Sequence, residues 1–302
     1  MRRTLILLVA VLLVAAACAG DDSGEETAAT TEATTTSTTV TTTTTGSTAG
    51  PEDCPTGDFL TELDGVQQPD DYGTVELAVS CDEDSLLVTS NSLIDYEFVQ
   101  ITPNDLAAVA QSWAIPLEPT EAEVPGALGL GVIGVAVNGV PLFGAFEAPQ
   151  QGYGDPLSDG LLDACNGHTA PGGMYHYHAR YGCLFVDPDE PGLVYGYSND
   201  GYAIVAPFGC TDAGCTQTEE VTSSYVKVDE SSNAAFDAWE YQEGAGDLDE
   251  CNGRTDEDGV YRYYLTDAFP YLPFCYHGVT DAAQGDFAGE PPADTGLPPG
   301  GP

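Results

Sequence analysis

The sequence predicts a mainly β protein: a sandwich-like or barrel-like single domain with an internally duplicated hairpin unit, stapled by disulfides. Three observations support this fold class. Short β-branched and aromatic runs alternate with clusters of Gly, Pro, Asn and Asp, which is typical of all-β domains. One motif occurs twice in the chain. An even number of cysteines remains once Cys18 is set aside, as expected for a disulfide-linked domain.

The first segment, residues 1–18, has the form of a lipoprotein signal peptide. Arg2 and Arg3 precede an apolar run that is too short to span a bilayer comfortably, and small residues lead up to Cys18. We expect lipidation of Cys18 to hold the chain extracytoplasmically, on the cell-surface or periplasmic face of a bacterial membrane. An uncleaved helical anchor and plain secretion are the alternatives.

The remaining chain divides into three parts by composition. Residues 19–51 are rich in Thr and carry no apolar periodicity, so we expect a disordered tether. Residues 281–302 are rich in Pro, Gly and acidic residues and predict a disordered tail. The domain lies between them at 52–280, with an N-terminal β region at 52–125 and a duplicated core at 126–280.

Eight segments of the domain are predicted strands, because they combine β-branched or aromatic residues with turn residues at both ends. They are 73–81, 85–94, 131–143, 173–181, 193–198, 202–208, 223–229 and 259–267. Two segments, 104–113 and 234–242, are predicted to form short helices.

The charge balance is strongly acidic, with 49 Asp and Glu against 6 Lys and Arg and a formal net charge of −43. Such a chain repels phosphate backbones, so nucleic acid is not an expected partner. The acidic surface favours solubility or a saline habitat; attraction of cations is the functional alternative.

The repeated motif reads LDACNGHTAPGGMYHYH at 162–178 and LDECNGRTDEDGVYRYY at 248–264. Both copies contain Asn-Gly, a tight-turn dipeptide, and Tyr-x-Tyr, which places two rings on one face of a strand. Each copy is followed by one further cysteine, so we expect equivalent bridges. The predicted pairs are Cys165–Cys183, Cys251–Cys275, Cys210–Cys215 and Cys54–Cys81.

The two copies differ at three positions that carry chemistry: His168, His176 and His178 of the first copy become Arg254, Arg262 and Tyr264 in the second. On a strand, His176 and His178 share a face, and His168 could supply a third imidazole. Three imidazoles suit Zn or Cu. Structural hydrogen bonding to carboxylates, or proton transfer without a metal, are the alternatives.

The second copy cannot bind a metal in the same way. Its two guanidinium groups, Arg254 and Arg262, could instead hold an anion or a carboxylate bidentately. The fourth histidine of the chain, His277, is interpreted as a surface residue, with a role as a further ligand as the alternative.

The chain resembles the bacterial YHYH domain family through Tyr175-His176-Tyr177-His178 and through further segments in the same order. These segments are 131–149, 162–168, 200–209, 248–255 and 264–275. The resemblance implies a secreted or anchored domain and names no reaction.

A metal-binding lipoprotein is therefore the favoured function, and binding is favoured over catalysis. The first alternative is an extracellular metal-dependent hydrolase or oxidase at the same histidines, with Asp200 as candidate catalytic carboxylate beside them. A carbohydrate-binding surface, suggested by the abundant tyrosines, or a purely structural module comes third. No nucleotide-binding fingerprint or nucleophile elbow occurs, so no nucleotide or organic cofactor is indicated. The expected partner is a metal ion or a small molecule.

Overall fold

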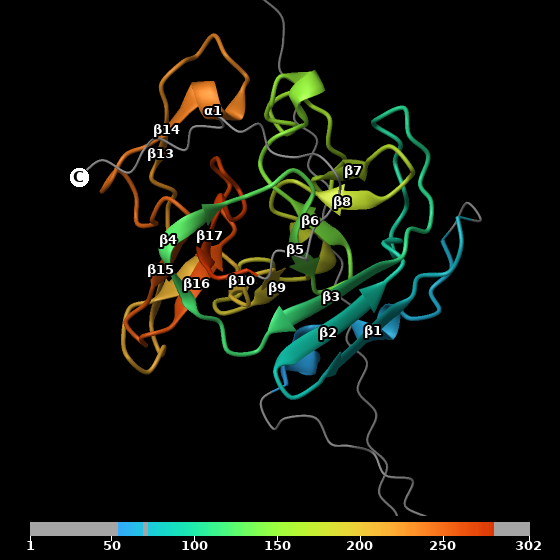
Figure 1. Cartoon of the computed structure of the whole chain (residues 1–302), viewed down its shortest axis with the longest axis horizontal. Helices are drawn as coiled ribbons and strands as arrows, with labels where there is room; N and C mark the ends of the chain where they lie inside the picture. Colours follow the sequence, from blue (N-terminus) through green and yellow to red (C-terminus); the bar gives the residue numbers. More distant parts are fainter. Residues whose placement is uncertain (1–53, 69–71, 281–302) are drawn as a thin grey trace, which may run out of the picture. The chain divides into compact units, whose positions relative to one another are not determined.

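A computed structural model describes residues 54–68 and 72–280. In these ranges the chain is mainly β, with several sheets, one short α-helix and four disulfides (Figure 1). The predicted signal peptide, the lipidation site Cys18, the Thr-rich tether and the C-terminal tail lie outside the described residues. None of the helices in the described part of the chain has the length and apolar character to cross a bilayer.

An antiparallel three-stranded sheet forms the N-terminal part. It contains β1 (Leu77–Cys81), β2 (Ser85–Ser90) and β3 (Gln111–Pro116), in the order β1-β2-β3. Alternate side chains of β2, such as Leu86 and Val88, are buried, which is the period-2 pattern that predicted a half-buried strand.

The helix predicted at 104–113 is wrong: residues 104–110 form neither helix nor strand, and residues 111–113 are the first residues of β3. The backbone N–H of Ala107 donates to the carbonyl of Gly173, so it bonds to a distant segment instead of to its own turn. Trp113 and Ile115 are buried at alternate positions of β3. Tertiary packing thus overrides the local helix propensity of the Ala-rich run.

The largest sheet has eight strands in the order β15-β16-β10-β9-β5-β6-β8-β7. The strands are β5 (Val132–Ala136), β6 (Pro141–Phe143), β7 (Gly167–Thr169), β8 (Tyr175–Tyr177), β9 (Val194–Ser198), β10 (Ala203–Val205), β15 (Gly253–Thr255) and β16 (Tyr261–Tyr264). The two copies of the repeated motif form the hairpins β7–β8 and β15–β16, at opposite ends of this sheet (Figure 1).

The two halves of the sheet are arranged alike. Hairpin β5–β6 is joined to hairpin β7–β8 by a parallel β6–β8 pair, and hairpin β9–β10 is joined to hairpin β15–β16 by a parallel β10–β16 pair. The halves meet where β5 and β9 pair antiparallel. This arrangement supports the predicted duplication, which itself stays a prediction.

Within each copy, one aspartate holds the turn that leads into the hairpin. Asp163 accepts hydrogen bonds from the backbone N–H groups of Cys165 (2.8 Å) and Gly167 (3.2 Å) and from the hydroxyl of Tyr175 (2.7 Å). Asp249 makes the same three contacts to the equivalent residues of the second hairpin. The local structure of the motif is therefore the same in both copies.

Three two-stranded sheets and a few short helices complete the described chain. The sheets are β4 (Glu121–Ala127) with β17 (Cys275–Gly278), β11 (Phe208–Cys210) with β12 (Thr218–Glu220), and β13 (Tyr225–Lys227) with β14 (Trp239–Tyr241). The helices are α1 (Ala235–Ala238) and the 3-10 turns η1 (Pro55–Asp58), η2 (Thr61–Leu63), η3 (Pro149–Gln151) and η4 (Gly182–Leu184). The segment predicted to be helical at 234–242 contains helix α1, but its residues 239–241 form β14.

The core is rich in tyrosine, and the four disulfides join the four cysteine pairs that the sequence predicts. The Tyr-x-Tyr rings of both hairpins point into this core, and Tyr175, Tyr177 and Tyr263 are fully buried. Since successive side chains of a strand alternate in direction, the residues between these tyrosines face the other way. Four disulfides indicate an oxidising, extracytoplasmic compartment.

Candidate metal centre

Three histidines converge at one end of the eight-stranded sheet. His168 on β7 lies directly opposite His176 on β8, and His178 follows β8 on the same face as His176. All three are buried, with exposed fractions of 6%, 2% and 2%. The hairpin register therefore brings together the three residues that the sequence predicts as ligands, within 4.8 Å of one another.

The Nε2 atoms point toward each other. His176 Nε2 lies 3.1 Å from His168 Nε2 and 2.9 Å from His178 Nε2. Each Nδ1 atom faces a backbone carbonyl instead: that of Leu161 at 2.9 Å for His168, that of Met174 at 3.2 Å for His176, and that of Gly144 at 2.6 Å for His178.

These carbonyl contacts determine the tautomer of each ring. A carbonyl only accepts hydrogen bonds, so each Nδ1 must carry the proton, and each neutral ring then has a lone pair on Nε2. Three lone pairs consequently face one another at hydrogen-bond distance, with no proton to share. A cation placed between them removes this repulsion, and a metal-bound histidine typically donates its other N–H to a carbonyl in this way.

Burial also keeps the three rings neutral. It lowers the pKa of His178 to about 3, lowers the pKa of His176 well below its usual value, and lowers the pKa of His168 as well. The neighbouring imidazoles act in the same direction on His176 and His178. Neutral imidazole is the form that binds metals.

Two further side chains border the cluster. The ring of Phe143 packs on His176, with 3.9 Å between ring centroids, and approaches His178 edge-on at 5.7 Å. The carboxylate of Glu147 lies 3.2 Å from His168 Nε2 and 4.0 Å from His178 Nε2 through its Oε1 atom. Sequence reasoning missed Glu147, because nothing local distinguishes it from the other acidic residues.

The arginines of the second hairpin have carboxylate partners within the chain. Asp256, whose side chain is fully buried, accepts from Arg254 Nε at 2.7 Å and from Arg262 Nη1 at 3.1 Å. The hydroxyl of Tyr264 and the backbone N–H of Cys210 also donate to Asp256. The two arginines therefore bind a carboxylate, as predicted, and that carboxylate belongs to Asp256 of the same domain.

Asp200 lies in the turn between β9 and β10, and its hydrogen bonds join this turn to β16 and β17. Its Oδ2 atom accepts from the hydroxyl of Tyr263 at 2.6 Å and from the backbone N–H of Gly278 at 2.8 Å. The equivalent turn between β5 and β6 carries Asn138, which donates to the hydroxyl of Tyr177. This correspondence supports a scaffold role for Asp200, in which the turn is tied to the second hairpin.

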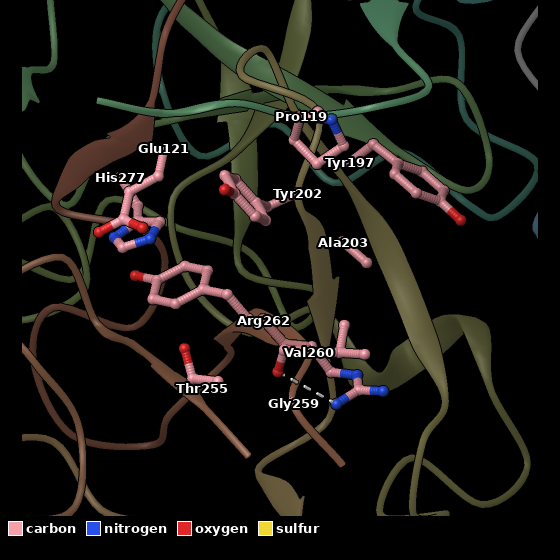
Figure 2. A pocket seen from close by; sticks show the side chains of 12 residues that line it. Pro119, Glu121, Tyr197, Tyr202, Ala203, Thr255, Gly259, Val260, Arg262 and His277 are labelled. Carbon is pink, nitrogen blue, oxygen red and sulfur yellow. Dashed lines mark hydrogen bonds between the residues drawn. The ribbon is translucent and has the colours of Figure 1, made fainter. Parts of the chain in front are cut away.

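His277 lines a pocket of about 450 Å³ beside the second hairpin (Figure 2). Tyr202, Tyr261, Arg262 and Glu121 also line this pocket. The imidazole of His277 stacks on Tyr261, with ring centroids 3.6 Å apart, and is not part of the three-histidine cluster. His277 was predicted to be a surface residue, but its ring is half-buried and stacked on Tyr261.

The tyrosines that suggested a carbohydrate surface do not offer an exposed face. Tyr175, Tyr177, Tyr263 and Tyr264 are fully buried, and Tyr261 is 8% exposed. Stacking on a sugar requires an accessible ring, which the four fully buried side chains lack. The ring of Tyr261 borders the pocket beside the second hairpin, but His277 stacks on it.

A second group of possible ligand atoms, Cys210, Cys215 and Asp258, does not have the chemistry of a metal site. The two sulfur atoms are joined in a disulfide, so neither is a thiolate. Asp258 pairs with Arg262 at 2.7 Å. Among the described residues, the histidine cluster is thus the group whose free donor atoms could hold a metal ion.

The fold and the site together define a disulfide-linked β domain with a buried three-histidine cluster. The family model described as YHYH protein matches residues 112–278, a range that includes both hairpins and all three histidines. The chain belongs to this family, as the sequence motifs predicted. No curated protein and no solved structure matches the chain.

Proposed function

We propose that this protein is an extracytoplasmic metal-binding lipoprotein whose domain holds one Zn or Cu ion through the Nε2 atoms of His168, His176 and His178. The observation that carries the proposal is the convergence of three Nε2 atoms at 2.9–3.1 Å while every Nδ1 atom is turned to a carbonyl. Three imidazole nitrogens are a ligand set that proteins use for both metals.

The surroundings support binding of a cation. The ligand rings are buried, so the ion would be shielded from competing water and chelators. The formal net charge of −43 of the whole chain raises the local concentration of cations around the protein. Burial of all three ligands also favours retention of an ion over turnover of a large substrate, which agrees with a binding function.

The metal proposal is tested by loading. The mature chain is purified in detergent, and a chelator removes any bound metal. The metal-free protein is then titrated with Zn²⁺ and with Cu²⁺ in competition with a chromogenic chelator. Bound metal is measured by mass spectrometry. We expect one ion per chain for the wild type and for the matched control His277→Ala, and loss of binding for His176→Ala/His178→Ala. Circular dichroism establishes that each variant is folded. Equal metal content in the wild type and a folded double variant would overturn the proposal.

The anchor is tested separately, because Cys18 lies outside the described residues. We expect the wild type to take up a radiolabelled fatty acid and to fractionate with membranes. A Cys18→Ala variant that still incorporates the label would contradict lipidation at this residue.

A further inference from the structure

We propose that Glu147 is the fourth ligand, so that the site is a closed three-histidine, one-carboxylate sphere for a divalent ion. This inference rests on the proposed function and specifies the charge of the ion that the site takes. Glu147 is assigned from the contacts of its carboxylate and of the loop that carries it.

The loop after β6 is attached to the histidine cluster and fixes the position of Glu147. The carbonyl of Gly144 accepts the Nδ1 proton of His178, so the same loop positions one ligand ring. The backbone N–H of Glu147 donates to the carbonyl of Gly154 at 2.8 Å, and the preceding residues Ala145 and Phe146 are buried. The carboxylate is consequently held beside the rings by both its backbone and its neighbours.

The Oε1 atom of Glu147 is buried and accepts no hydrogen bond from any described residue. Its nearest polar neighbour in the cluster is His168 Nε2 at 3.2 Å, which carries a lone pair in the tautomer described above. A buried carboxylate oxygen facing a nitrogen lone pair is unfavourable for both atoms. Four acceptor atoms, three nitrogens and one oxygen, therefore share one small volume.

A proton and a metal ion are the two species that could relieve this arrangement. A proton on His168 Nε2 would satisfy the contact to Glu147 but would leave the 2.9 Å contact between His176 and His178. A metal ion accepts electron pairs from all four atoms. Ligands at about 2.0–2.2 Å from a tetrahedral ion lie roughly 3.3–3.6 Å from each other, and the separations here are 2.9, 3.1, 3.2 and 4.0 Å.

The ligand set selects the ion. One carboxylate oxygen and three imidazoles suit borderline divalent ions such as Zn²⁺, whereas Cu⁺ prefers soft sulfur ligands. The carboxylate also neutralises one of the two charges of a divalent ion in this buried position. A complete set of four protein ligands is typical of structural sites, whereas catalytic sites keep one position open. The inferred site thus retains a divalent ion and lacks a position for a substrate.

The test compares Glu147→Gln with Glu121→Gln, a control at the separate pocket of the second hairpin. Zn²⁺ affinity is measured by chelator competition, and Co²⁺ is used as a spectroscopic probe of coordination. We expect Glu147→Gln to bind Zn²⁺ at least 10-fold more weakly and to lose the intense visible bands of four-coordinate Co²⁺ with a carboxylate ligand, while Cu⁺ affinity stays within 2-fold. The control should behave as the wild type.

The melting temperature of the metal-free proteins is a second readout, and it should change in the opposite direction to Zn²⁺ affinity. The side-chain amide introduced by Glu147→Gln can donate to a histidine lone pair, so this substitution should raise the melting temperature of the metal-free protein while weakening Zn²⁺ binding. A merely structural glutamate would lose stability when replaced. Unchanged Zn²⁺ affinity and an unchanged Co²⁺ spectrum in Glu147→Gln would overturn the fourth ligand and leave the three-histidine site intact. Failure of the wild type to bind any ion would instead overturn the proposed function.

Discussion

The paired aspartates of the two hairpins allow the metal centre to be tested at a residue that does not touch it. Asp163 makes three hydrogen bonds at the start of the first hairpin, and Asp249 makes the equivalent three in the second. Asp163→Ala should free the turn that carries His168, whereas Asp249→Ala should free the turn that carries Arg254. The two variants remove the same local interactions from the copy that carries the proposed metal site and from the copy that carries the salt bridges.

The magnitude follows from the contacts. Each hydrogen bond contributes about 1 kcal/mol net to the free energy of unfolding, and more when one partner is charged, so three bonds contribute about 3 kcal/mol. Burial raises the pKa of Asp249, which means that desolvation offsets part of this gain in the second copy. We therefore expect about 2–3 kcal/mol of destabilisation in each metal-free variant, with Asp249→Ala at the lower end.

Urea unfolding of the metal-free proteins measures the stability, and Zn²⁺ competition measures the site. We expect Asp163→Ala to weaken Zn²⁺ binding by about 10- to 100-fold, as is usual when a residue that orients ligands is lost. Asp249→Ala should bind Zn²⁺ as the wild type does. If both variants weaken Zn²⁺ binding equally, the argument that Asp163 acts through its own hairpin is refuted.

Three further outcomes are expected. Burial holds the pKa of His178 at about 3, against about 6.5 in an unfolded chain, so the metal-free fold keeps its full stability above pH 6.5 and loses it as the pH falls. Between pH 7 and pH 5, protonation linked to this histidine alone should lower the free energy of unfolding by about 2 kcal/mol, measured by urea unfolding. If the stability of a His178→Asn variant depended on pH as strongly as that of the His277→Asn control, this expectation would be contradicted. Asp256→Ala leaves two guanidinium groups without their buried partner, so it should lower the free energy of unfolding by about 3 kcal/mol. Zn²⁺ affinity should stay unchanged; a loss of Zn²⁺ binding would contradict the view that the two hairpins act independently. Phe143→Ala removes the ring packed on His176 and should weaken Zn²⁺ binding about 10-fold, as seen when support for a ligand is lost; unchanged affinity would show that the hairpin alone orients His176.

Much of the candidate metal centre could be predicted because its three histidines are close in sequence. A two-residue spacing on a strand places His176 and His178 on one face, and the hairpin turn returns His168 to a position opposite His176. The even cysteine count and the repeat likewise predicted the Cys165–Cys183 and Cys251–Cys275 bridges. The other two pairs were predicted because Cys210 and Cys215 are close in sequence and because Cys54 and Cys81 both lie in the N-terminal region. These features depend on local geometry, which a sequence records directly.

Features that depend on long-range packing could not be predicted in the same way. Glu147 reaches the cluster because β6 pairs in parallel with β8, an arrangement that no short motif specifies. The segment 104–113 has helical composition but bonds through Ala107 to Gly173, far along the chain. His277 was interpreted as a surface residue, and its stacking on Tyr261 requires β17 to lie beside the second hairpin. In each case the deciding contact joins segments that are distant in sequence.

The two hairpins show how one scaffold can acquire opposite electrostatic requirements. In the second copy, Arg254 and Arg262 present donors, and the acceptor they need, Asp256, is supplied by the same hairpin. In the first copy, His168 and its two partners present lone pairs, and the adjacent side chain is Glu147, another acceptor. The donors of the second copy therefore have acceptors within the domain, whereas the acceptors of the first copy would be satisfied by the cation that we propose. If the proposed site holds a metal ion, replacing acceptors with donors at equivalent positions would remove the need for that ion while the Asn-Gly turn, the Tyr-x-Tyr strand and the disulfide stay the same.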